Sequence, residues 1–168
     1  MRQVDVVGVR LELPSNQPVL ILRDQQATRY LPLWIGTAEA TAISLALDGV
    51  EPPRPLTHDL LSNVINQLGG QITSVTVSEL VEGTFYATIN FLNHDSISAR
   101  PSDAVALAIR NQVPVFVAQE VMDFAGMDLA IDDDFEPNEG GFTDSDMSQE
   151  ELDKFRAFLD DIQPEDFS

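Results

Sequence analysis

Apolar and polar positions alternate along the first 35 residues, as they do in β-strands with one buried face. The alternation predicts strands over residues 4–13, 19–24 and 30–35, separated by the turn signals "PSNQP" and "QQAT". From residue 37 the apolar positions recur at helical spacing, through Ala40, Ile43 and Leu47. This spacing predicts a helix that Thr37 caps and Gly49 ends.

A second helix is predicted after the linker "VEPPRP". In "THDLLSNVINQLGG" the apolar residues recur every three or four positions from Leu60 to Leu68, which is typical of an amphipathic helix. Thr57 is the expected cap of this helix, and Gly69 is expected to end it.

The second half of the chain repeats the pattern of the first. Strands are predicted over residues 71–80, 83–92 and 95–100, and a helix over residues 101–112. Aligning "WIGTAEATAISLAL" with "SARPSDAVALAIRN" places Glu39 on Asp103 and Ile43 on Leu107, at a constant offset of 64 residues. A short apolar strand and a helical turn follow in "VPVFVAQEVMDFAG". We therefore expect a duplicated strand–strand–strand–helix unit.

These elements predict an α+β fold, because helices follow each trio of strands instead of alternating with single strands. Short turns within each trio favour a mostly antiparallel sheet. The domain is expected to span residues 1–131, followed by an acidic, flexible linker over residues 132–147. Residues 148–168 are expected to form a C-terminal helical tail, since Ser148 and Glu151 have capping-box spacing. This tail is either a docked helix or an autoinhibitory mimic of nucleic acid.

The charge is strongly unbalanced, with 28 acidic and nine basic residues and a net charge of −19. Residues 132–168 carry −12 of this charge and residues 1–131 carry −7. The few basic residues form no cluster, which argues against tight nonspecific binding of nucleic acid. The chain has no cysteine, which excludes disulfides, thiolate zinc sites and a cysteine nucleophile. Without a long apolar run or a signal-like N-terminus, we expect a cytoplasmic protein that has no membrane partner.

The candidate catalytic and binding residues lie where the predicted helices begin. Each of three helix starts carries an acidic residue, Glu39, Asp59 or Asp103, which alone would only complement the helix dipole. His58 begins one of the same helices. Two arginines that each precede a proline stand nearby in the sequence, Arg54 and Arg100. The repeat predicts that Glu39 and Asp103 face one another, so these side chains are expected to line one polar pocket.

Three functions fit such a pocket. Carboxylates with a neutral imidazole are suitable ligands for Mg²⁺ or Mn²⁺, and such an ion assists phosphodiester hydrolysis. Alternatively, the same residues form helix starts and ion pairs in a non-enzymatic regulatory or binding module. A small-molecule hydrolase or ligand-binding protein is the third alternative. The chain contains no P-loop, GxGxxG, HExxH or CxxC motif.

Three phrases in this order, "LPLWIGTAEATAI", "RPLTHDLL" and "RPSDAVALAIR", resemble the bifunctional nuclease domain family over residues 1–130. The closing "FRAFLDDIQPEDF" resembles the C-terminal extension of bacterial members. The resemblance implies a nuclease that cleaves DNA and RNA, an antiparallel-rich α+β fold with an internal repeat, and a homo-oligomer, dimeric or higher.

The resemblance carries over to eight positions, whose roles are our inference. The expected catalytic residues are Glu39, His58, Asp59 and Asp103, of which Glu39 and Asp103 are the expected metal ligands. The expected substrate-binding residues are Arg54, Thr57, Arg100 and Ser102. A divalent metal, Mg²⁺ or Mn²⁺, is the expected cofactor.

Overall fold

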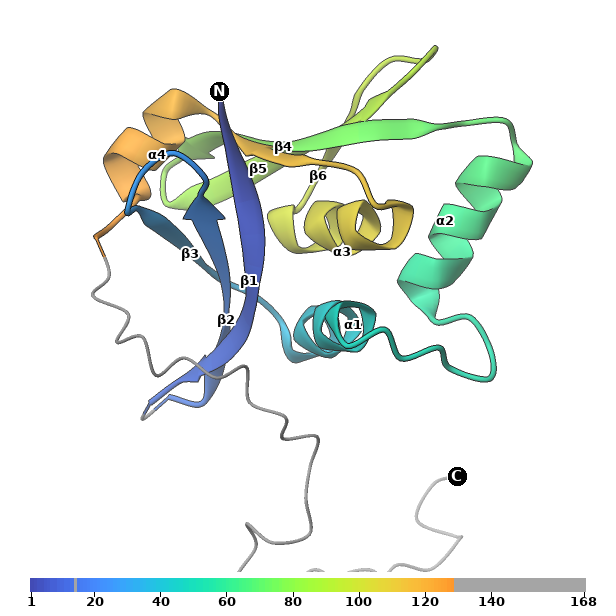
Figure 1. Cartoon of the computed structure of the whole chain (residues 1–168), viewed down its shortest axis with the longest axis horizontal. Coiled ribbons are helices and arrows are strands. Elements are labelled where there is room, and N and C mark those ends of the chain that lie inside the picture. The colour runs from blue at the N-terminus through green and yellow to red at the C-terminus, as the bar shows by residue number, and fades with distance from the viewer. Residues whose placement is uncertain (14, 129–168) are drawn as a thin grey trace, which may run out of the picture. The chain divides into compact units, whose positions relative to one another are not determined.

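The computed structural model describes residues 1–13 and 15–128, which lie within one compact unit of residues 1–130 (Figure 1). The predicted acidic linker (132–147) and helical tail (148–168) lie outside the described residues, and the domain boundaries stay a prediction. The elements are, in chain order, β1 (Arg2–Glu12), β2 (Gln17–Asp24), β3 (Tyr30–Trp34), α1 (Thr37–Leu47), α2 (Thr57–Gln67), β4 (Ile72–Val81), β5 (Thr84–Phe91), β6 (Ile97–Ala99), α3 (Pro101–Asn111), β7 (Val115–Val117) and α4 (Gln119–Ala125).

The strands form one sheet in the order β3-β2-β1-β7-β4-β5-β6. Two antiparallel meanders, β1-β2-β3 and β4-β5-β6, are joined through the short strand β7. In this strand Val115 pairs with Val4 of β1 in the antiparallel sense and with Val75 of β4 in the parallel sense. The predicted α+β fold with a mostly antiparallel sheet is confirmed.

The order strand–strand–strand–helix occurs twice, as β1-β2-β3-α1 and β4-β5-β6-α3, with α2 between the two units. Glu39 and Asp103 take the same position in their helices, the third residue. That agrees with the aligned offset, while a duplication as the origin of the two units stays a prediction.

The core forms where α3 packs between the sheet and α1. Residues 104–108 of α3 are almost completely buried, with Leu107 only 1% exposed, and they pack on β4 and β5. Three of these five residues are alanines, whose small side chains let the backbones approach closely. On α1, Ala40 and Ile43 face the core, and Figure 1 shows α1 and α3 side by side. The N-termini of the two helices are thereby brought to the same region.

Two details of the helix starts differ from the prediction. Thr37 and Thr57 are the first helical residues, and the N-caps are Gly36 and Leu56, neither of which makes a side-chain capping hydrogen bond. The predicted threonine caps are therefore wrong. The predicted stops at Gly49 and Gly69 coincide with positive φ angles of 67° and 82°, which glycine adopts without strain.

Helix α2 also turns its apolar residues in an unexpected direction. Its buried residues are His58 and Ser62, whereas Leu60, Val64 and Leu68 are exposed. An apolar stripe on a helix ordinarily faces the core. Among the described residues, no helix is long and apolar enough to cross a membrane.

We expect Leu107→Ala to lower the free energy of unfolding by about 2–5 kcal/mol, because it removes a buried side chain and leaves a cavity. Leu92→Ala, at a side chain that is 59% exposed, is the control and should change stability by less than about 0.5 kcal/mol. Chemical denaturation measures both. Equal effects of the two substitutions would contradict the placement of α3 in the core.

Candidate functional site

Helices α1, α2 and α3 are built alike at their N-termini. Each contains 11 residues and carries an acidic residue at its third position: Glu39, Asp59 and Asp103. At this position a carboxylate lies near the positive end of the helix dipole and can fold back toward free backbone N–H groups. All three carboxylates also pair with an arginine, which a dipole role alone does not require.

The carboxylate of Glu39 folds back over the start of α1. A hydrogen bond from its own backbone N–H and a second from Arg100 hold the pKa of Glu39 below its usual value. A Cβ on Gly36 would lie 2.2 Å from Oε2 of Glu39. The absence of a side chain at Gly36 therefore makes room for this carboxylate.

Arg100 connects the starts of α1 and α3. Its Nε donates to Oδ2 of Asp103 (2.7 Å), and its Nη2 donates to Oε1 of Glu39 (2.6 Å) and to Oδ1 of Asp103 (3.1 Å). These two carboxylates raise the pKa of Arg100. The guanidinium side chain remains 67% exposed, and these contacts leave the two N–H groups of Nη1 uncommitted.

His58 approaches the same carboxylate from α2. Its Nε2 lies 3.1 Å from Oδ1 of Asp103, and the imidazole is largely buried. Burial alone would raise the pKa of Asp103, but hydrogen bonds from Arg100 and His58 outweigh it and hold this pKa below its usual value. The ionised carboxylate accepts hydrogen bonds only, so Nε2 must be the donor. In the neutral imidazole Nδ1 is then the proton acceptor.

Arg110 of α3 and Asp59 of α2 form a second ion pair. Nε of Arg110 donates to Oδ1 of Asp59, while its Nη1 and Nη2 donate to the carbonyls of Ala106 (3.0 Å) and Ala42 (3.1 Å). Arg110 therefore ties α1, α2 and α3 together. Burial raises the pKa of Asp59, but hydrogen bonds from Arg110 and from the N–H of Leu56 (2.8 Å) outweigh it and lower this pKa overall.

Sequence reasoning did not single out Arg110, although the residue closes the phrase "RPSDAVALAIR". The signal was its distance from Asp103, because seven residues are two helical turns and place both side chains on one side of α3. The sequence did not indicate that Arg110 pairs with Asp59 of α2, since that contact depends on tertiary packing.

Four of the eight predicted residues come together: Glu39, His58, Arg100 and Asp103, which we call the polar cluster. Asp59 turns to Arg110 instead, and the described structure joins neither Arg54 nor Thr57, both exposed, to another side chain. Ser102 is buried at 6% exposure. The substrate-binding roles of Arg54, Thr57 and Ser102 stay predictions.

The polar cluster does not fit a divalent metal in this arrangement. The guanidinium of Arg100 already lies between the carboxylates of Glu39 and Asp103, in the position of a bridging cation. Within residues 1–13 and 15–128, no three His, Asp or Glu side chains form a group that could hold a metal ion. The divalent metal therefore stays a prediction.

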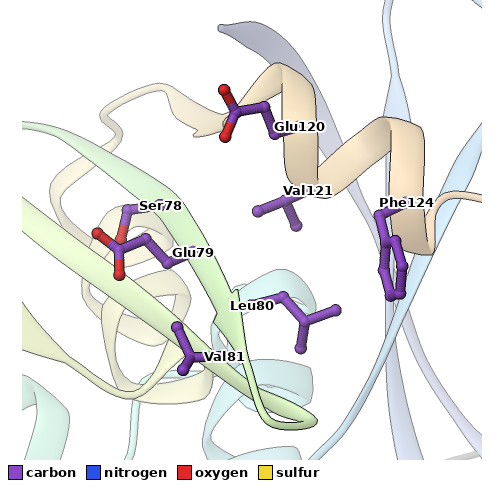
Figure 2. A pocket seen from close by; sticks show the side chains of 7 residues that line it. All are labelled: Ser78, Glu79, Leu80, Val81, Glu120, Val121 and Phe124. Carbon is purple, nitrogen blue, oxygen red and sulfur yellow. The ribbon is translucent and has the colours of Figure 1, made fainter.

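A pocket of about 360 Å³ lies elsewhere, between β4 and α4. Figure 2 shows Leu80, Val121 and Phe124 around it, with the carboxylates of Glu79 and Glu120 at its border. The predicted site residues do not line this pocket, so it does not support the small-molecule alternative for the polar cluster.

Comparison with known proteins identifies relatives of this chain. The family model of the bifunctional nuclease domain matches residues 20–130. Uncharacterized proteins from two strains of Mycobacterium tuberculosis are 47% identical over 167 residues, which are 99% of this chain and 98% of theirs.

Two plant proteins are more distant relatives. Bifunctional nuclease 1 of Oryza sativa subsp. japonica is 24% identical over 122 residues, or 69% of this chain and 37% of the plant protein. Bifunctional nuclease 2 of Arabidopsis thaliana is 25% identical over 114 residues, or 62% of this chain and 35% of the plant protein. The resemblance in the three phrases is thus confirmed at the level of the family.

We expect the Arg110–Asp59 pair to show a coupling energy of about 1–3 kcal/mol in a double-mutant cycle of Arg110→Met and Asp59→Asn. The side chains are only 10% and 25% exposed, so solvent screens the pair little. The pair Arg23–Asp5, at 51% and 40% exposure, is the control and should couple by less than about 1 kcal/mol. Equal coupling energies would contradict a special role for Arg110.

The lowered pKa of Asp103 predicts a pH-dependent contribution to stability. A carboxyl whose folded pKa lies below the unfolded value of 3.8 stabilises the fold above pH 3.8, and this stabilisation is lost as the pH falls through the folded pKa. The wild type should therefore exceed Asp103→Asn in stability at pH 5–7, and the difference should shrink below about pH 3.8. A difference that stays constant with pH would contradict the ion-pair geometry. Urea denaturation at each pH measures it.

Proposed function

The chain belongs to the bifunctional nuclease domain family, and from that premise we propose that it cleaves phosphodiester bonds of RNA and DNA at the polar cluster. One observation carries the proposal: an imidazole oriented by a carboxylate lies beside an exposed guanidinium. A general base and a phosphate-binding cation are the two groups that such a cleavage needs.

His58 is the proposed general base. Because Oδ1 of Asp103 accepts a hydrogen bond from Nε2–H, Nδ1 carries the lone pair of the neutral imidazole and takes a proton from the attacking hydroxyl. Asp103 then stabilises the imidazolium that forms, as the carboxylate does in other Asp–His pairs. The attacking hydroxyl is a water molecule for DNA, and a water molecule or the 2′-hydroxyl for RNA.

Arg100 is the proposed phosphate-binding residue. Its free Nη1 hydrogens donate to the non-bridging phosphate oxygens, where negative charge develops as the new P–O bond forms. The P–O bond to the leaving oxygen, which lies opposite the attacking oxygen, then breaks; this oxygen takes a proton from solvent water, and His58 releases its proton to solvent. Glu39 positions the guanidinium, and Gly36 leaves room for Glu39.

The acidity of the chain bears on substrate binding. Residues 1–131 carry a net charge of −7, and within the polar cluster one arginine faces two carboxylates. A polyanionic substrate is therefore repelled at long range, and raising monovalent salt should strengthen its binding by screening. Most nucleic-acid-binding proteins show the opposite dependence.

A second candidate function is a non-enzymatic regulatory or binding module. The observation that favours it is the Arg110–Asp59 pair, which is largely buried and ties three helices together without offering a reactive group. In that function Arg100 likewise serves only to connect α1 and α3. If this second function is correct, the purified protein should be folded and should not cleave nucleic acid.

The test is cleavage of a structured RNA and of supercoiled DNA by the purified protein at pH 7, with excess EDTA. The wild type should cleave, and His58→Gln and Asp103→Asn should each lower the rate at least about 100-fold. His94→Gln is the matched control, because the chain has two histidines and His94 is exposed between β5 and β6. It should retain the wild-type rate.

Two outcomes would contradict the proposal. Folded wild type without cleavage, in EDTA and with Mg²⁺ or Mn²⁺, would favour the non-enzymatic module. Cleavage that requires a divalent ion and survives in His58→Gln would show that His58 is not the general base. It would favour Glu39 and Asp103 as metal ligands.

A further inference from the structure

The proposed cleavage does not use the pocket between β4 and α4. Its volume is about 360 Å³, and no residue of the polar cluster lines it. In the view of Figure 2, Leu80 and Val121 lie in the middle of the pocket. The carboxylates of Glu79 and Glu120 lie to the left of and above them, and the ring of Phe124 lies to the right. We call these five residues the acidic pocket.

A β-bulge in β4 turns Glu79 away from the core. Side chains two apart share a face of a regular strand, so Glu79 would otherwise lie on the buried face with Val75 and Val77. The pairing with β5 shifts between Val77 and Glu79, which sets Glu79 opposite the exposed Tyr86. The N–H of Ala118 donates to the carbonyl of Val77 (2.8 Å), so α4 begins beside the bulge. The bulge thus places a carboxylate at the wall of the pocket instead of in the core.

The two carboxylates of the acidic pocket are not neutralised. Among the residues that the structure describes, neither Glu79 nor Glu120 accepts a hydrogen bond or joins an ion pair, and no arginine or lysine lines the pocket. Asp123 on the same helix, in contrast, accepts from Gln119 (2.8 Å) and from Arg29 (3.5 Å). The dipole of α4 favours Glu120 in its first turn, but Glu79 lies on a strand, where no helix dipole acts. The pocket therefore combines unpaired negative charge with an apolar floor.

The wall of the acidic pocket is open to solvent. The ring of Phe124 is 83% exposed, whereas Val121 on the same helix is only 4% exposed. A small-molecule site ordinarily buries about 70–90% of its ligand, which a wall this exposed does not do. An exposed aromatic ring beside an apolar floor is instead typical of a protein interface, where the surface of the partner covers the ring. The shape therefore favours a side chain that a larger partner presents.

We propose that the acidic pocket binds a basic peptide segment of a partner protein, in which an arginine is flanked by apolar residues. The guanidinium pairs with Glu79 and Glu120, because its planar fork suits carboxylates. Its aliphatic stem lies along Leu80 and Val121, and a flanking apolar side chain packs on Phe124.

The charge of the acidic pocket selects this partner. Two unpaired carboxylates repel nucleic acid, an anionic membrane surface and a second copy of this chain, whose net charge is −19. They attract a cation, and the apolar floor favours a cation that carries an apolar neighbour. Because the pocket shares no residue with the polar cluster, the inference stands whether or not the chain cleaves nucleic acid.

The test is the binding of a capped hexapeptide of alternating arginine and leucine to the full-length chain. Isothermal titration calorimetry measures the affinity, and ¹H–¹⁵N spectra locate the contact through shifts in residues 78–81 and 120–124. We expect saturable binding with a dissociation constant below about 1 mM. Glu79→Gln with Glu120→Gln should raise this constant at least about 10-fold, and Phe124→Ala at least about 5-fold.

Glu51→Gln with Asp95→Asn is the matched control pair. Both carboxylates are exposed and lie outside the pocket, and the pair changes the net charge by the same amount as the pocket pair. Residues 132–168 attract cations through their own charge of −12, and both pairs leave this attraction unchanged. The control pair should therefore keep the wild-type dissociation constant, and circular dichroism should show that all variants are folded.

The absence of saturable binding, or equal weakening by the pocket pair and the control pair, would overturn the proposal. So would equally tight binding of a hexapeptide with citrulline in place of arginine, because citrulline has the shape of arginine without its charge. Spermidine that shifts the same residues and binds as tightly as the hexapeptide would assign the pocket to a small organic cation, and would also overturn it.

Discussion

The bridge that Arg100 makes between Glu39 and Asp103 is the interaction on which the candidate site depends. It joins the N-termini of α1 and α3, which belong to different halves of the chain, and both carboxylates lie where helix dipoles already favour negative charge. Hydrogen bonds from Arg100 and His58 lower the pKa of Asp103 and so favour the ionised form, which is the form that accepts the hydrogen bond from the imidazole. Gly36 leaves room for the carboxylate of Glu39, and the short strand β6 ends directly before Arg100.

A second arginine sets the position of α2. Arg110 holds Asp59 while it donates to backbone carbonyls of α1 and α3, so one side chain fixes three helices. The imidazole of His58 then reaches Asp103 as a consequence of that packing. Arginine suits this role because its planar fork supplies five donors in fixed directions, which a lysine does not.

The sequence predicted the strands and helices well, because alternation and helical spacing report burial directly. It also predicted that Glu39 and Asp103 meet, through the repeated pattern. It did not predict that Arg110 is the partner of Asp59, since a long-range ion pair leaves no local pattern. The threonine caps were wrong because folded-back third-position carboxylates and paired arginines occupy those helix starts. The sequence did not predict that the apolar side of α2 faces solvent, because periodicity identifies an apolar face but not the side on which the helix packs.

The most direct test of the central claim is the imidazole spectrum of the protein during titration with a short RNA or DNA. The chain has two histidines, so ¹H–¹⁵N spectra of the ring nitrogens separate His58 from His94, and His94→Gln assigns the signals. Binding at the polar cluster should shift the Nδ1 and Nε2 signals of His58 and leave those of His94 in place, and Asp103→Asn should abolish that response. Bound oligonucleotide that leaves the His58 signals unchanged would contradict the account.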